Sequence, residues 1–129
     1  MALKKADRAV ELYQMGDLKQ ASSLFDLCRK KLSQPEHMHI CAVTYFKIGR
    51  HNDAQSMLNK LIQRVNITPQ LMSLSGDINK AKGNSDAAIK DYRRAVSMAP
   101  QTPELHYNLA LGLFDKLELS EAIIVLKLS

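Results

Sequence analysis

The chain has 129 residues, of which 46% are hydrophobic and 24% charged, values that fit one folded domain and exclude disordered, collagen-like and low-complexity proteins. Its 18 Lys and Arg outnumber 13 Asp and Glu, for a formal net charge of +5, but acidic residues are interspersed, so no nucleic-acid-binding patch is expected. No apolar run approaches the roughly 18 residues of a membrane span and no secretory signal begins the chain, so we expect a cytoplasmic protein without membrane attachment.

Eight amphipathic helices are predicted in chain order, from the periodicity of apolar residues and from the helix-ending residues between them. They lie near residues 2–15, 18–32, 36–48, 51–64, 69–82, 85–98, 103–116 and 119–128. Glycines 16, 49 and 83 end the first helix of three successive pairs, where a left-handed backbone is needed. Leu117 takes that place in the fourth pair, so a tighter or differently shaped turn is expected there.

The helix pairs follow a repeat of 34 residues. Prolines 35, 69 and 103 are spaced by 34 and each begins a pair, at a position where the missing N–H has no helical partner anyway. An alanine recurs at nearly the same spacing and is followed four residues later by a large side chain, which indicates a tightly packed helix face; these alanines are Ala21, Ala54, Ala88 and Ala122. The whole chain is therefore predicted to be one domain, 1–129, with repeats near 2–34, 35–68, 69–102 and 103–129, the last one incomplete.

This pattern resembles the tetratricopeptide repeat (TPR), whose 34-residue unit carries an alanine followed by an aromatic residue and then a proline. The third copy matches best, with Gly83, Ala88, Tyr92 and Pro100. Asn79 occupies a place where the family often has tyrosine, so a buried amide that needs hydrogen-bond partners is expected there. The resemblance implies an all-α solenoid in which about four helix-turn-helix units stack into a right-handed superhelix.

The resemblance also implies a function, because TPR arrays bind peptides or partner proteins in a concave groove lined by the first helix of each repeat. The chain is thus expected to be a protein-interaction scaffold or adaptor. Besides Val10 and Ser73, the residues that occupy groove-facing places are Tyr13, His39, Val43, Phe46, Lys47, Asp77, Lys80, Tyr107, Leu111 and Phe114. Some of them, Phe46 and Phe114 included, serve equally well to pack against neighbouring helices.

One subgroup of the family clamps the C-terminal carboxylate of chaperones with Lys, Asn and Arg side chains. In this chain the equivalent places hold uncharged or acidic residues, whether the alignment starts from the first repeat or from the second. They are Ala6, Val10, Ile40, Gln70 and Leu74, or His39, Val43, Leu74, Glu104 and Asn108. Because no cationic fork is present, a bidentate grip on a terminal carboxylate is not expected.

No catalytic, cofactor or metal site is predicted. His37 and His39 are two positions apart on a predicted helix, which directs their rings to different sides instead of toward one metal ion. Cys28 and Cys41 form no CxxC motif, and free cysteines are common small core residues. The chain is therefore not expected to be an enzyme.

The C-terminal helix is rich in apolar residues, including Ile123 and Leu126. If nothing covers this face, it is a site of self-association, for instance in a homodimer. A second interpretation is that the chain forms an N-terminal accessory or oligomerisation region of a larger multidomain protein, such as a sulfotransferase or glycosyltransferase. The identity of the partner and the oligomeric state do not follow from the sequence.

Overall fold

The computed structural model describes residues 2–128, with the side chains of residues 4–118, 121 and 124–127. This part of the chain is helical and contains no strand. The helices are α1 (Ala2–Gln14), α2 (Leu18–Cys28), the 3-10 helix η1 (Arg29–Lys31), α3 (Pro35–Lys47), α4 (His51–Ile62), α5 (Pro69–Ala81), α6 (Ser85–Met98) and α7 (Pro103–Leu128). They divide into two compact units, Met1–Asn66 and Ile67–Ser129. The predicted all-α fold is confirmed, and no helix among the described residues is long and apolar enough to cross a membrane.

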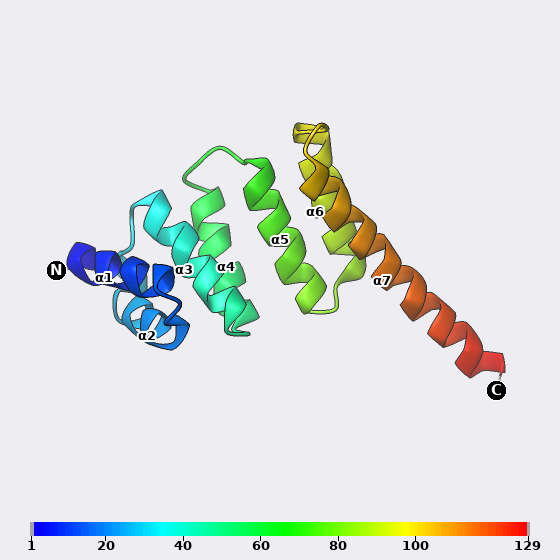
Figure 1. Cartoon of the computed structure of the whole chain (residues 1–129), viewed down its shortest axis with the longest axis horizontal. Coiled ribbons are helices and arrows are strands. Elements are labelled where there is room, and N and C mark those ends of the chain that lie inside the picture. The colour runs from blue at the N-terminus through cyan, green and yellow to red at the C-terminus, as the bar shows by residue number, and fades with distance from the viewer. Residues whose placement is uncertain (1, 129) are drawn as a thin grey trace. The chain divides into compact units, whose positions relative to one another are not determined.

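The turns inside the first three helix pairs have the backbone that the sequence predicts. Gly16, Gly49 and Gly83 adopt φ angles of +85°, +87° and +82°, in the left-handed region that costs other residues about 1–2 kcal/mol. Each turn is followed at once by the next helix of the pair (Figure 1). Local backbone preference therefore sets where these helices end.

In the first unit, α1 packs against α2, α3 packs against α4, and both helices of the first pair contact α3. The repeated alanines are the close-contact points, since Ala21 and Ala54 are fully buried. Large side chains fill the space beside them, including Phe25, Tyr45 and Leu58. The small and large residues that alternate in the repeat therefore pack together in this core.

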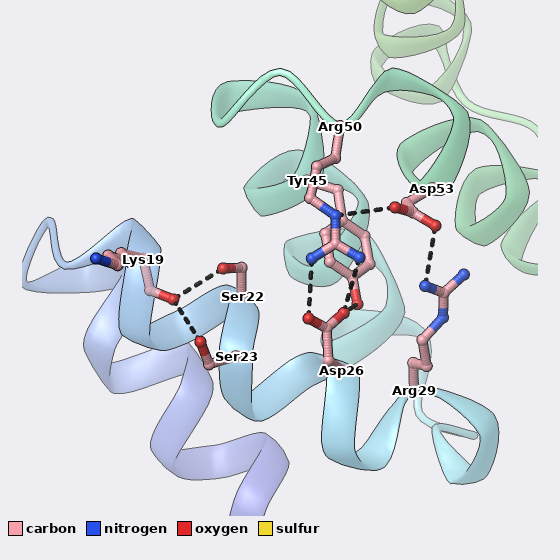
Figure 2. Close-up of polar contacts among 8 residues, drawn as sticks. All are labelled: Lys19, Ser22, Ser23, Asp26, Arg29, Tyr45, Arg50 and Asp53. Atoms are coloured by element: carbon pink, nitrogen blue, oxygen red, sulfur yellow. Dashed lines mark hydrogen bonds and ion pairs between the residues drawn. The ribbon is translucent and has the colours of Figure 1, made fainter.

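A network of ionic and aromatic contacts joins α2, η1, α3 and α4 (Figure 2). Arg50 donates to both carboxylate oxygens of Asp26 at 2.9 Å and, through Nε, to Asp53 at 2.9 Å. Arg29 donates to the second oxygen of Asp53 at 3.0 Å. Tyr45, whose ring lies under the Arg50 guanidinium at 4.4 Å, donates its hydroxyl to Asp26 at 2.7 Å. The network therefore ties the second repeat to the first by bidentate and cation–π contacts.

In the second unit, α5 and α7 both pack against α6. The ring of Tyr92 on α6 lies between Gly76 of α5 and Gly112 of α7, and its hydroxyl donates to Asp77 at 2.5 Å. Asn79 is buried and donates its amide to Asp91 at 2.8 Å. This confirms the expectation that a buried amide at position 79 finds a partner.

The predicted turn near residue 117 is wrong. α7 runs without interruption from Pro103 to Leu128, and its C-terminal half extends beyond α6 (Figure 1). Residues 113–128 contain neither glycine nor proline, so a left-handed turn there would force a side-chain-bearing residue into an unfavourable backbone. Continuing the helix satisfies the backbone hydrogen bonds at no such cost.

Candidate partner-binding surface

A cavity of about 620 Å³ lies between α1 and α3 in the first unit, within the size range of ligand pockets. Its apolar part comes from Val10 and Ile40, and half-buried His39 stands beside them. Gln14 also lines it, from the exposed side of α1. Both helices are first helices of their repeats, so this is the surface that the sequence assigned to the groove.

The rim of the cavity is acidic. Asp7, Glu11 and Glu36 line it, and none of the lining residues that the structure describes is Lys or Arg. Buried His37 lies with Nε2 3.0 Å from Asp7 Oδ1, which links the two helices at one end of the cavity. Burial lowers the pKa of His39, so this ring stays neutral at pH 7 and adds no positive charge.

The two histidines line the same cavity, although the sequence assigned them to different sides of the helix. They do not make a metal site, because no group of three or more His, Cys, Asp or Glu residues is arranged to hold a metal ion among the residues described. The structure thus brings together ring nitrogens and carboxylates that can hydrogen-bond a polar partner.

On the same two helices, Tyr13 of α1 and Lys47 of α3 form a pair. The Lys47 ammonium donates to the Tyr13 hydroxyl at 3.1 Å and lies 5.0 Å from the centre of its ring. Val43 is half-buried, and the ring of Phe46 packs against His51 of α4 with centroids 5.7 Å apart. Phe46 therefore has a packing contact of its own, as the alternative interpretation of the sequence allowed.

In the second unit, the predicted polar residues are held by neighbours. Asp77 accepts the Tyr92 hydroxyl, and burial raises the pKa of its carboxyl. Lys80 pairs with Asp115 of α7 at 3.4 Å. Ser73 is half-buried, and its hydroxyl oxygen is buried without a hydrogen-bond partner.

The aromatic candidates of α7 are open to solvent, since 64% of Tyr107 and 56% of Phe114 are exposed. Leu111 between them is half-buried. Leu126 is 75% exposed, whereas the side chain of Ile123 lies outside the described residues. The groove candidates thus fall into two sets, one on α1 and α3 and one on α5 and α7.

Sequence reasoning missed the acidic rim. Asp7 and Glu11 are four residues apart, which places them on one face of a helix, and Val10 and Gln14 repeat that spacing beside them. That signal was available in the first helix. The contribution of Glu36 was not, because it depends on how α3 packs against α1.

The family model of the TPR repeat matches residues 76–116, from the middle of α5 into α7. The first TPR domain of Spaghetti (RPAP3), solved with the HSP90 peptide SRMEEVD, superposes with a TM-score of 0.76 at 19% identity, over 90% of this chain and 93% of that domain. The chain has the TPR fold.

Two further solved structures also superpose on this chain. MamA from Desulfovibrio magneticus RS-1 gives a TM-score of 0.82 at 17% identity, covering 95% of this chain and 70% of that one. The second TPR domain of human RPAP3, solved with the HSP70 peptide SGPTIEEVD, gives 0.74 at 15% identity, covering 86% and 93%. No curated protein sequence gives a significant match to this chain.

Proposed function

We propose that this TPR chain is a protein-interaction scaffold that binds a peptide or a peptide-like segment of a partner protein, and that the cavity between α1 and α3 is part of its binding site. The observation that carries the proposal is this cavity of about 620 Å³, which has an apolar floor and polar groups on its rim. Ligand sites in proteins combine the same two features.

Two further observations support binding over catalysis. The RPAP3 domains of the same fold were solved with bound peptides. Both cysteines are buried and unpaired, and burial raises the pKa of the Cys41 thiol to about 12, which leaves it unreactive at neutral pH. Free thiols also fit the reducing cytoplasm, the location that we propose.

Each unit also carries further groove candidates of its own. In the first unit, Tyr13 of α1 and Lys47 of α3 offer an aromatic ring and an ammonium group. In the second unit, Tyr107 and Phe114 offer exposed aromatic surface on α7. Exposed aromatic side chains are common anchors for protein partners. We propose that the partner is a protein or peptide, and neither a nucleic acid nor a membrane.

The proposal is tested by selecting random 12-residue peptides on the immobilised chain and measuring the affinity of the selected peptides by calorimetry. Gln14→Trp plugs the cavity from an exposed position and leaves the core unchanged, so we expect at least about tenfold weaker binding. Gln20→Trp places the same side chain at an exposed site on α2 and should bind normally. If no peptide is selected, or if Gln14→Trp binds the selected peptides as the wild type does, the proposed site is wrong.

Exposed apolar residues on α7 support a second role, self-association into a homodimer. Leu117 and Leu126 are 60% and 75% exposed, and exposed apolar side chains are available to an interface. Light scattering over a concentration series should show a dimer that Leu126→Asp dissociates. A mass that stays monomeric at every concentration contradicts this role. The accessory-region interpretation is not favoured by any feature described above.

A further inference from the structure

We propose that the cavity between α1 and α3 recognises a cationic side chain of the partner, a Lys or Arg that enters next to an apolar residue. The inference rests on the proposed function and names the chemistry of the ligand at that site. It follows from the charge of the cavity, which is opposite in sign to the net charge of the chain.

Three carboxylates from two helices converge on the cavity. Asp7 and Glu11 come from successive turns of α1, and Glu36 comes from the first turn of α3. The side chains of Asp7 and Glu11 are each 62% exposed, so both carboxylates are accessible from solvent. A cation that enters from solvent therefore meets carboxylate oxygens on both walls.

Few positive groups of the protein compete with such a cation. Among the described residues that line the cavity there is no Lys or Arg, and the basic side chains are those of His37 and His39. His37 is directed to Asp7 by the 3.0 Å contact, and His39 is half-buried. Arg8 pairs with Glu11 at 3.0 Å, but this exposed pair is three residues apart on one helix, a type of contact that contributes at most a few tenths of a kcal/mol. A ligand can displace Arg8 at little cost.

The floor of the cavity gives the second half of the recognition. Val10 and Ile40 provide apolar surface within the same cavity as the carboxylates. The aliphatic stem of Lys or Arg packs on such surface while its charged head reaches the acidic rim. An acidic segment would instead bring like charges together, which disfavours binding.

The experiment compares the peptides selected on the wild-type chain with their binding to charge variants. We expect Lys and Arg to be enriched among peptides that Gln14→Trp no longer binds. Glu11→Gln combined with Glu36→Gln removes two rim charges but retains the contact between Asp7 and His37, and should weaken these peptides about tenfold at low salt. Raising the ionic strength should weaken the wild-type complex in the same direction.

Glu118→Gln combined with Glu121→Gln is the matched control, because it changes the net charge equally at two exposed positions that do not line the cavity. It should leave affinity unchanged. Selected peptides that depend on the open cavity but lack basic residues, or that bind the Glu11→Gln, Glu36→Gln variant normally, overturn the inference and leave the proposed function intact. Failure to select any cavity-dependent peptide overturns both.

Discussion

The packing of Tyr92 between two glycines makes a sharp prediction for Gly76→Ala. A Cβ atom at position 76 would lie 2.5 Å from Cε1 and 2.7 Å from Cδ1 of the Tyr92 ring, far inside ordinary van der Waals contact. The ring cannot move aside easily, since it is 1% exposed, is bounded on the other side by Gly112, and is fixed by its hydrogen bond to Asp77.

Opposing effects set how far Gly76→Ala changes the free energy of unfolding. Replacing glycine by alanine inside a helix stabilises the helix by about 0.8–1 kcal/mol. Overpacking costs about 1–3 kcal/mol, and displacing Tyr92 from its carboxylate acceptor costs about 1.5–3 kcal/mol more. We therefore expect Gly76→Ala to lower the free energy of unfolding by about 1.5–5 kcal/mol. At Gly112 the nearest ring atom is 3.2 Å away, so Gly112→Ala should cost less.

Urea denaturation followed by circular dichroism measures both variants. The control is a double-mutant cycle with Tyr92→Leu, which removes most of the obstructing ring; in that background Gly76→Ala should lose most of its cost. If Gly76→Ala is as stable as the wild type, or costs the same in both backgrounds, the steric account of this contact is refuted.

Three other predictions concern the repeat itself. Ala88→Leu should lower the free energy of unfolding by about 1–3 kcal/mol, because Ala88 is fully buried, and a tolerated substitution in thermal denaturation would contradict the repeat register. Gly83→Ala should lower the free energy of unfolding by about 1–2 kcal/mol through its positive φ alone, since its Cβ would meet no atom within 4 Å. If thermal denaturation shows the stability of the wild type, the turn does not require glycine. Hydrogen bonds from Arg50 lower the pKa of the Asp26 carboxyl, so its contribution is present above the unfolded pKa of about 4 and is lost as the pH falls through the lower folded value. Asp26→Asn should therefore destabilise the chain by about 1 kcal/mol near neutral pH, a figure reduced for solvent screening, and by progressively less in acid; an unchanged difference in denaturation midpoint from neutral pH to acid would argue against this linkage.

The C-terminal helix shows where a repeat pattern stops predicting structure. Ala122 continues the alanine series of the earlier repeats, and this periodicity led to a predicted helix pair. The backbone at residues 116–118 lacks the glycine that ends the other first helices, and α7 continues through it. The missing glycine therefore decided the structure here against the longer repeat pattern. Leu117 at the place of that glycine favours an unbroken helix.

Most of the helices followed from residues with strong local preferences. Glycines at positive φ and prolines at the first helical position act through their own backbone, so their effect can be predicted from the sequence. The all-α fold and the TPR resemblance follow from the same local signals and from the 34-residue period. The acidic cavity does not, because Asp7 and Glu36 are 29 positions apart and meet only through the packing of α1 against α3. The enclosure of Tyr92 by two glycines was likewise set by the tertiary structure, since distances between side chains on separate helices depend on how those helices approach one another.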